Sequence, residues 1–487
     1  MPRPSPLDVY GLLDKSNCGE CGYETCMAYA AGLLERKVRV EDCKHLMEDP
    51  KQQKKKRKLK EMLMPPQRPV RIGVGENEIT IGGEEVLMRH QLTYYNQTAF
   101  FIQLSDNQEN LLETIKYLDE VKVERIGETL KIQGIALRCV SKDGEVFKNA
   151  AKKVVENTNY PLMLCCLEPE FLMGAATEIK DTKPALYAAT KDTWEELGKF
   201  AIQNDLPLVI STPTGDLDEL MSLSATLKKL GSKQLILDPG TFFGPGGISV
   251  TYNNLSQLRI AGINNENENA GWPIMGVPAA YWTQIGKTDD QELWEAKYQE
   301  IIMGAIMVSE AASLLVLDTG QEKEDIWALL ALMTLRQAIY SDPRIYPAVD
   351  EGIYEVGEPG EDSPVFVTSN YRLTKIPVEL DIKAANWDAY LLVSDSEGIG
   401  IESAVAGGQF SAGSIAETVK KSKIFDKVNH RILIIPGMAA RLSGELEDEA
   451  DAFVLVGPRD SSGIGSFMDK KWNPEEYMKE YASWKED

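Results

Sequence analysis

Three apolar runs in the middle of the chain decide its fold: LMLCC at 162–166, ALYAA at 185–189 and LVIS at 208–211. Each run is short, and a stretch with the character of a helix separates it from the next. Runs that stay apolar on both faces indicate strands buried on both sides, as in a parallel sheet. The three runs therefore predict consecutive β–α units.

The same pattern continues on both sides of these runs, from Arg68 to about residue 340. The complete set of predicted strands is 99–104, 135–139, 162–166, 185–189, 208–211, 234–238, 273–276 and 314–318. Eight such units in about 250 residues predict a TIM-type (β/α)8 barrel. Polar residues end several strands, where such a barrel places its functional groups: Asp106, Arg138, Glu168, Ser211, Asp238 and Asp318. Helix capping and loop contacts would explain these residues equally well.

A second α/β pattern begins after residue 364. The segment 343–364 is rich in Pro, Gly and acidic residues and predicts a linker. Apolar runs follow at 364–368, 390–394, 432–436 and 452–457, each followed by small polar residues. These runs predict an open, doubly wound α/β sheet with a ligand crevice beyond the carboxyl ends of its strands.

The composition is that of a multi-domain globular protein, with 487 residues, 43% of them hydrophobic and 26% charged. The 75 acidic and 52 basic residues give a formal charge of −23, which disfavours nucleic acid and anionic membranes as partners. The sequence shows neither a signal peptide nor a membrane span, so we expect a cytoplasmic protein.

Four of the seven cysteines lie near the amino terminus, in the order Cys18, Cys21, Cys26 and Cys43. We expect a compact unit here, with short helices at 7–13 and 27–36. Four thiolates suit either zinc or an iron–sulfur cluster. A zinc ribbon normally has two C-x2-C knuckles, whereas this sequence has one. The spacing therefore favours a 4Fe-4S cluster. We expect the remaining cysteines, Cys139, Cys165 and Cys166, to be inert thiols of the barrel core.

A basic run, KQQKKKRKLK at 51–60, follows this unit, with prolines at 65, 66 and 69. The run predicts a solvated linker that lets the first unit swing. A docking strip for an acidic surface is the alternative. A nucleic-acid-binding tail is disfavoured because no aromatic residue interleaves the charges.

The last domain offers three loops at 367–374, 394–400 and 436–445, with a further loop at 457–463. Such loops present backbone N–H groups and hydroxyls with little side-chain bulk, which suits a dinucleotide, a flavin or a tetrapyrrole. The motif GIGIES at 398–403 is only a partial dinucleotide fingerprint. The three histidines, His45, His90 and His430, lie outside any D-x-H-x-x-G stretch, so a corrinoid here would have no histidine ligand. We expect each histidine to be a surface or loop group.

Several segments together resemble one known family. They are 17–21 with Cys26 and Cys43, 82–90, 367–370 with Leu373 and Thr374, 395–398, 435–437, 443–447 and 456–459. In this order, from about residue 7 to 470, the chain resembles the large (gamma) subunit of the corrinoid/iron–sulfur protein, a component of acetyl-CoA decarbonylase/synthase.

The resemblance implies an α/β protein of three modules. They are a small 4Fe-4S domain with its basic linker at 1–60, a TIM barrel at 66–341 and a Rossmann-like, doubly wound corrinoid-binding domain at 342–487. It implies a methyl carrier whose cobalt cycles between Co(I) and methyl-Co(III), moving methyl between a methyl-tetrahydropterin or folate and acetyl-CoA synthase. The corrinoid would be base-off, and the cluster would restore stray Co(II).

The resemblance also implies site residues and partners. Cys18, Cys21, Cys26 and Cys43 would ligate the cluster, and the cobalt itself would be the reactive centre. The corrinoid contacts would be Thr368, Ser369, Asn370, Thr374, Gly398, Pro436, Gly437, Ala439, Leu442, Ser443, Gly444, Glu445, Gly457, Pro458 and Arg459. The partners would be a delta-type small subunit, a pterin or folate methyltransferase, acetyl-CoA synthase with CO dehydrogenase, and a reductive activator.

Three other functions stay open from the sequence. The chain could be a paralogous corrinoid protein that serves another methyltransferase. It could be an iron–sulfur electron-transfer protein with a flavin or nicotinamide in its last domain. It could also be an enzyme whose own barrel binds the pterin.

Overall fold

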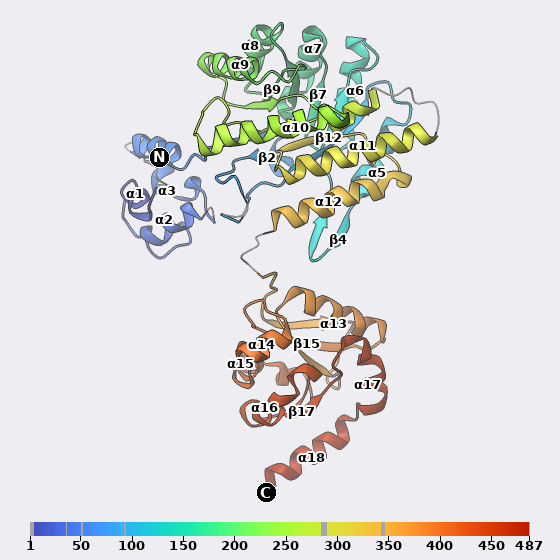
Figure 1. Ribbon diagram of the computed structural model, residues 1–487. Coiled ribbons are helices and arrows are strands. Elements are labelled where there is room, and N and C mark those ends of the chain that lie inside the picture. Colours follow the sequence, from blue (N-terminus) through green and yellow to red (C-terminus); the bar gives the residue numbers. More distant parts are fainter. Residues whose placement is uncertain are drawn as a thin grey trace. The chain divides into compact units, whose positions relative to one another are not determined.

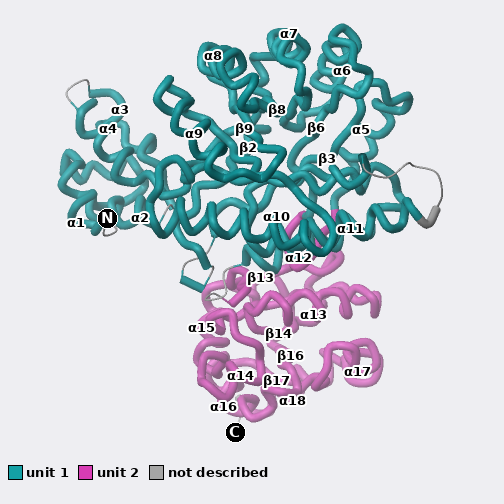
Figure 2. The backbone as a smooth tube through the Cα atoms, turned by 45° about the horizontal axis from the view of Figure 1, so that its top comes forward, with its two compact units in different colours: residues 1–122, 130–341 teal, residues 123–129, 342–487 magenta. Residues whose placement is uncertain are grey.

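The structure, a computed structural model, describes residues 4–35, 37–49, 52–88, 90–91, 94–283, 290–341 and 346–486 (Figure 1). The chain forms two compact units, coloured separately in Figure 2. One unit comprises residues 1–122 and 130–341, and the other comprises 123–129 and 342–487. Within the described residues, none of the helices combines the length and the apolar character that a bilayer crossing requires.

The first unit contains the predicted eight-stranded parallel barrel. The strand order is β10-β9-β8-β7-β6-β3-β12-β11, and a parallel bridge between Leu237 and Ile274 brings its two ends together. All eight predicted strands are confirmed. They are β3 (Ala99–Ser105), β6 (Gly134–Arg138), β7 (Leu162–Cys165), β8 (Ala185–Ala189), β9 (Leu208–Ser211), β10 (Leu235–Asp238), β11 (Met275–Gly276) and β12 (Leu314–Leu317).

A helix follows each barrel strand and buries one apolar face against it. In α6, Phe147, Ala150, Ala151 and Val154 are buried, which is the spacing of one helical face. The barrel helices are α5 (Leu111–Glu120), α6 (Gly144–Asn157), α7 (Pro169–Ile179), α8 (Trp194–Asn204), α9 (Leu217–Leu230), α10 (Gly244–Arg259), α11 (Asp290–Ser309) and α12 (Ile326–Tyr340).

A hairpin of β1 (Pro69–Ile72) and β2 (Ile79–Gly82) covers the amino end of the barrel. The N–H of Arg68 donates to the carbonyl of Gly271, and the N–H of Gly73 donates to Lys183, which precedes β8. The sequence analysis did not predict this hairpin. It also missed a second hairpin, β4 (Val123–Arg125) with β5 (Glu128–Leu130).

The second unit is an open sheet in the order β13-β15-β14-β16-β17. The four predicted strands are confirmed as β14 (Val365–Ser369), β15 (Ala389–Ser394), β16 (Ile432–Ile435) and β17 (Phe453–Val456), all parallel. The chain passes from β14 to β15 on one side and then to β16 on the other. The topological switch point therefore lies between β14 and β16.

Helices cover both faces of this sheet. One core contains residues of α14 (Ile401–Gly407), α15 (Ala412–Ser422) and α16 (Ser443–Ala450). The other contains residues of α13 (Arg372–Ala384) and α17 (Ile464–Lys471). A last helix, α18 (Pro474–Glu486), follows.

The predicted linker at 343–364 is wrong over part of its length. β13 (Gly352–Val356) lies within it and pairs antiparallel with β15. An edge strand is only half covered, so its acidic, glycine-containing sequence resembles a linker. Residues 342–345, where we expected the domain boundary, lie outside the described residues.

The amino-terminal segment consists of α1 (Pro6–Tyr10), α2 (Cys26–Leu34), the 3-10 turn η1 (Val40–Asp42), α3 (Lys44–Glu48) and α4 (Gln53–Met62). The two short helices predicted here correspond to α1 and α2. The basic run forms α4 rather than an extended linker, because Leu59 is fully buried in the core of this segment. Lys51 lies outside the described residues. The division between this segment and the barrel remains a prediction.

Candidate functional site

Left-handed turns shape the cysteine loop between α1 and α2. Asn17, Gly19 and Gly22 have φ values of 50°, 75° and 83°, a region that glycine and asparagine enter most easily. The Asn17 side-chain oxygen accepts the N–H of Cys26 at 2.8 Å, which ties the start of the loop to the start of α2. The loop therefore turns back on itself, as a cluster-binding loop must.

All four predicted ligand cysteines line one pocket. Cys18 and Cys21 come from the loop, Cys26 begins α2, and Cys43 precedes α3. Cys21, Cys26 and Cys43 also pack against the apolar core of the segment. Burial, together with the nearby Asp14, Cys21 and Cys26, raises the pKa of the Cys43 thiol.

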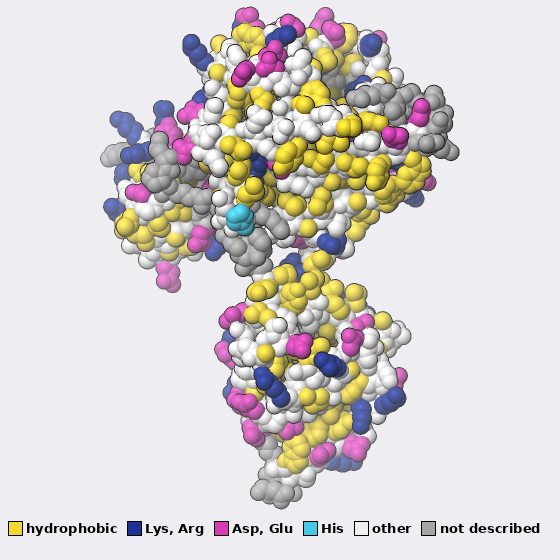
Figure 3. All heavy atoms as spheres, viewed as in Figure 1, with side chains coloured by type: hydrophobic (Ala, Val, Ile, Leu, Met, Phe, Trp, Pro, Cys, Tyr) yellow, Lys and Arg dark blue, Asp and Glu magenta, His cyan; other side chains and the backbone are white. Residues whose placement is uncertain are grey.

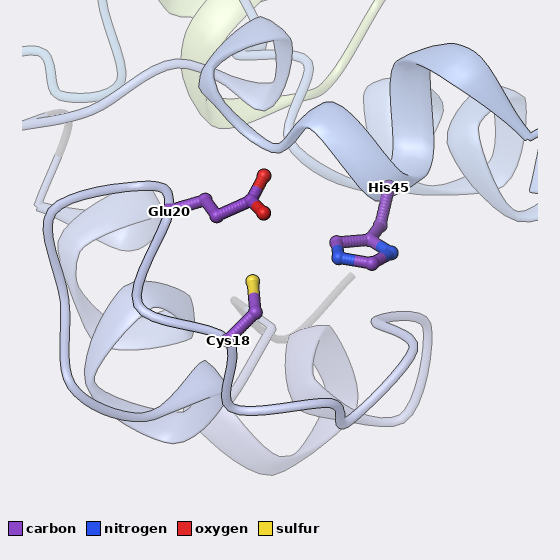
Figure 4. A group of neighbouring side chains, drawn as sticks. All are labelled: Cys18, Glu20 and His45. Carbon is purple, nitrogen blue, oxygen red and sulfur yellow. The ribbon is translucent and has the colours of Figure 1, made fainter.

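Figure 4 shows two further side chains near Cys18. The donor atoms of Cys18, Glu20 and His45 lie within 4.8 Å of one another, and all three residues are exposed. His45 Nδ1 lies 3.3 Å from the Asp14 carboxylate. The sequence analysis did not select Glu20 or His45, although each lies within two residues of a predicted ligand cysteine.

The donor set fits an iron–sulfur cluster. Four thiols from one turn-rich loop and one remote position surround a single pocket, and thiolates are the usual ligands of such clusters. The Cys18, Glu20 and His45 group is exposed and contains one thiol, a set better suited to a hard or borderline divalent ion. Cys18 belongs to both sets, and the convergence of the other three cysteines favours the four-thiol set.

In the second unit, the predicted residues at the end of β14 lie at the switch point. Thr368 and Ser369 are fully buried. Among the residues that the structure describes, neither hydroxyl has a hydrogen-bond partner. A buried hydroxyl without a partner costs about 1–3 kcal/mol, so such groups in native proteins normally meet water or a ligand.

Asn370 organises the adjacent loop after β15. Its side-chain oxygen accepts the N–H of Ser396 at 3.0 Å, the Ser396 hydroxyl at 2.8 Å and the N–H of Gly398 at 2.9 Å. Its amide nitrogen donates to Asp395 at 2.8 Å. Asn370 is therefore a structural centre of this edge of the sheet.

The loops after β16 and β17 approach each other through glycines. The N–H of Gly437 donates to the carbonyl of Pro458, and a Cβ at Gly437 would lie 2.8 Å from the Arg459 nitrogen. A Cβ at Gly457 would lie 3.1 Å from Ile434 and from the Ile435 carbonyl oxygen. The backbones therefore meet more closely than side chains would allow.

The remaining predicted contacts occupy the same edge with different exposure. Pro436 follows β16, Ala439 and Leu442 are buried in the following 3-10 turn, and Ser443 begins α16. Thr374 lies in the first turn of α13. Gly444, Glu445 and Arg459 are exposed. The structure thus brings the predicted set to one edge of the sheet, but only its buried members form a packed site.

Ser394, a hydroxyl residue of this edge, was not selected from the sequence. Ser394, at the end of β15, is fully buried and accepts a hydrogen bond from Thr418 of α15 at 3.2 Å. Ser369 and Ser394 occupy paired positions on neighbouring strands. The alternation of side chains along β15 could have indicated Ser394, since Leu392 faces the same core.

His430 lies away from this edge. It precedes β16, its Nε2 lies 2.9 Å from the Ser363 carbonyl oxygen, and its Nδ1 accepts the N–H of Ile432. His430 therefore lies in a loop, as expected, but it is buried rather than on the surface, and it contacts backbone at the amino end of β16. His45 and His90 are exposed, as expected.

Three of the polar residues at the barrel strand ends, Asp106, Ser211 and Asp238, form hydrogen bonds within the barrel. Asp106 accepts the N–H groups of Val140 and Ser141, both at 2.9 Å. Asp238 accepts the hydroxyls of Tyr187 and Ser211, and burial raises its pKa. Burial also raises the pKa of Cys165 and Cys166 to about 12, in agreement with inert thiols.

Comparisons with known proteins bear on both units. Residues 69–468 match a family model described as the CO dehydrogenase/acetyl-CoA synthase delta subunit, and residues 13–45 match one described as "Putative Fe-S cluster". Among solved structures, dihydropteroate synthase from Xanthomonas albilineans covers 56% of this chain and 100% of its own, with a TM-score of 0.38 and 13% identity. That likeness is too weak to bear on function.

Full-length relatives give the most specific match. The acetyl-CoA decarbonylase/synthase complex subunit gamma of Methanothermobacter thermautotrophicus is 40% identical over 466 residues, covering 95% of this chain and 98% of its own. The gamma subunit of Archaeoglobus fulgidus is 39% identical over 482 residues, covering 98% and 100%. The chain therefore belongs to the family of acetyl-CoA decarbonylase/synthase complex gamma subunits.

Proposed function

We propose that the chain is a methyl carrier with a 4Fe-4S cluster in its amino-terminal segment and a cobalt corrinoid in its carboxyl-terminal unit. When bound, the corrinoid supplies a metal that accepts and releases a methyl group, and the cluster supplies the electron that keeps this metal reduced. The roles of the chain itself are to bind both groups, to position them and to exclude water.

Cys18, Cys21, Cys26 and Cys43 are the proposed cluster ligands. Their common pocket and their apolar surroundings support this assignment. Burial of a thiol opposes its ionisation, so the positive charge of bound iron is what would hold the four sulfurs as thiolates.

One observation carries the corrinoid assignment: the buried hydroxyls of Thr368 and Ser369 lack partners among the described residues and lie at the switch point of the sheet. A ligand with polar groups along an inserted tail would satisfy the Ser369 hydroxyl on one face of the sheet, and Thr368, on the other face, would need a further polar group or a water. Ser369 shares its side of the sheet with Ala439 and Leu442, which would give the tail apolar surroundings.

Exposed apolar side chains at the same edge support a flat, largely apolar ligand. Leu373 of α13 is 43% exposed, and Met438, which follows Gly437, is 41% exposed. Both would lose contact with water under a macrocycle, and burial of such side chains stabilises binding. The close backbone approach at Gly437 and Gly457 would frame the ligand with N–H groups rather than side chains.

The gamma relatives are by name subunits of a complex, so we propose that this chain also acts with partner proteins. They are a delta-type small subunit, a pterin or folate methyltransferase, acetyl-CoA synthase with CO dehydrogenase, and a reductive activator. A cytoplasmic location is part of the same proposal.

The test is spectroscopic. The protein is purified without oxygen, its cobalt and iron are counted, and its ultraviolet–visible and electron paramagnetic resonance spectra are recorded. We expect one corrinoid and four irons per chain, with a Co(II) signal that lacks nitrogen hyperfine splitting. A flavin spectrum without cobalt, and failure to take up added corrinoid in the presence of the delta-type subunit, would contradict the proposal.

A second measurement separates the methyl carrier from a protein whose barrel binds the pterin. The isolated chain is mixed with methyl-tetrahydropterin, with and without a separate methyltransferase. We expect transfer only when the methyltransferase is present. If the isolated chain accepts the methyl group without the methyltransferase, the pterin-binding site lies in the chain's own barrel.

A further inference from the structure

The helix α4 carries a cationic surface on a chain whose formal charge is −23. Within Gln53–Met62 it has five lysines and Arg57, and a single acidic residue, Glu61. Lys54, Lys55 and Lys58 are exposed, and none of them has an ion-pair partner among the described residues. Figure 3 shows Lys and Arg side chains gathered on the amino-terminal segment. This surface is thus opposite in sign to the chain as a whole.

The helix is fixed to the same core as the cysteine pocket. Leu59 of α4 is fully buried, in one apolar cluster with Cys21, Cys26 and Cys43. Lys60 forms an ion pair with Glu41, and Glu41 lies in the 3-10 turn that ends directly before Cys43. The ten residues of α4 make a helix about 15 Å long. The cationic surface therefore lies beside the pocket rather than on a free tether.

We propose that the exposed face of α4, formed by Lys54, Lys55, Arg57 and Lys58, is a docking surface for an acidic protein that delivers electrons to the amino-terminal cluster. Charge complementarity identifies the occupant, because unpaired lysines beside a redox pocket attract a negatively charged surface. The formal charge of the chain and the lack of aromatic residues in α4 both argue against nucleic acid.

This inference rests on the proposed cluster. The reaction transfers one electron: the reduced cluster of the acidic protein is oxidised by one electron, and the oxidised cluster of this chain is reduced by one, with no bond made or broken. Exposed charges are screened beyond about 8–10 Å at physiological salt. Docking through α4 should therefore be strongly dependent on ionic strength.

The experiment uses the anaerobically purified chain with its cluster and a reduced, acidic 2[4Fe-4S] ferredoxin as the probe. Cluster reduction is followed by stopped-flow absorbance between 50 and 500 mM NaCl. The test variant combines Lys54→Glu, Lys55→Glu and Lys58→Glu. The matched control combines Lys229→Glu, Lys233→Glu and Lys323→Glu, which change the net charge equally at exposed positions of the barrel unit. Titanium(III) citrate, a small reductant that needs no docking surface, is used in parallel.

We expect the test variant to be reduced by ferredoxin at least about tenfold more slowly than wild type at low salt, and to lose most of the salt dependence. The control variant should behave as wild type, and titanium(III) citrate should reduce all three proteins alike. A triple Lys→Gln variant, which removes charge without reversing it, should give an intermediate rate.

Three other outcomes would overturn the inference in different ways. If ferredoxin reduces the test variant and wild type at equal rates, and titanium(III) citrate reduces both normally, then α4 is not the docking surface although the cluster is present. If the purified protein contains no reducible cluster, both the proposed function and the proposed docking surface are contradicted. If single-stranded DNA or anionic vesicles, added at the same total negative charge as the ferredoxin, slow cluster reduction by ferredoxin, the surface is assigned to those partners instead.

Discussion

The side-chain oxygen of Asn370 accepts the backbone N–H of Gly398 at 2.9 Å, which joins the loop after β14 to the loop after β15. Gly398 has a φ of 71°, and a Cβ there would lie 2.9 Å from the Cβ of Tyr346. The two residues therefore hold the carboxyl edge of the sheet in one arrangement, at the place where we propose that the corrinoid binds.

Asn370→Ala should loosen this edge. The change leaves the N–H groups of Ser396 and Gly398 without their acceptor, at a cost of about 1–3 kcal/mol in the local free energy of unfolding. Native-state hydrogen exchange of amides in β14 and β15 measures this cost. Corrinoid affinity should fall as well. Asn429→Ala, which removes an exposed contact with Glu361, is the control. Unchanged exchange in the Asn370 variant would show that the network carries no stability.

Gly437→Ala should destabilise the second unit and weaken corrinoid binding. Its new Cβ would lie 2.8 Å from the Arg459 backbone nitrogen, so two loops must separate, at a cost of about 1–3 kcal/mol. Gly444→Ala is the matched control for stability alone, because nothing lies within 4 Å of its Cβ and the residue is helical, whereas Gly444 is itself a proposed corrinoid contact. That change should be neutral or stabilise the protein by up to about 1 kcal/mol. Equal effects of the two changes would argue against a close-packed edge.

Variants of the amino-terminal pocket should distinguish the two donor sets. Cys21→Ser and Cys18→Ser should each abolish a stable four-iron cluster, as measured by iron and sulfide counts. His45→Ala should keep four irons per chain, because the imidazole belongs to the exposed group and not to the four thiols. Cys165→Ser, in the barrel, controls for general loss of cysteine. Loss of iron in the His45 variant would favour a mixed ligand set.

Reduction of the corrinoid should depend on the cluster, while methyl transfer by a reduced corrinoid should not. In the Cys21→Ser protein, reactivation of Co(II) by a physiological reductant should stop. Methyl transfer should survive after chemical reduction to Co(I). Rates of both steps, followed by absorbance, test this separation of roles. Normal reactivation of the Cys21 variant would show that electrons reach the corrinoid by another route.

Acidification should destabilise the second unit through His430. Burial lowers the pKa of this imidazole, so the folded state prefers the neutral form. Its stabilising contribution is fully present above the unfolded pKa of about 6.5 and is lost as the pH falls through the lower folded pKa. Protonation of Nδ1 would also break the hydrogen bond from Ile432.

The check is hydrogen exchange of β16 amides at pH 7.5 and 5.5, corrected for intrinsic exchange rates. His430→Asn, whose side-chain oxygen can replace Nδ1 as the acceptor, should reduce the loss of stability at low pH. His90→Asn, at an exposed position, should leave the pH dependence unchanged. An identical pH dependence in the His430 variant would exclude this histidine as the source.

Strand positions could be read from the sequence because they depend on local patterns. LVIS at 208–211 is apolar in its first three positions and buried in all four, and such a run is stable only when it is covered on both faces. The same reasoning failed for β13, since an edge strand that is half covered needs no continuous apolar run. It failed for α4 because one buried residue, Leu59, decides whether a basic segment packs or extends.

The sequence by itself determined where the eight barrel strands and the four parallel strands of the second sheet lie along the chain, and which four cysteines share a pocket, because residue type and spacing carry that information. Only the tertiary structure decided which hydroxyls lack partners, which loops meet at Gly437 and Arg459, and that Glu20 and His45 lie beside Cys18. These relationships join residues through strand order and helix packing, and the strength of each depends on distances that no local pattern of amino acids encodes.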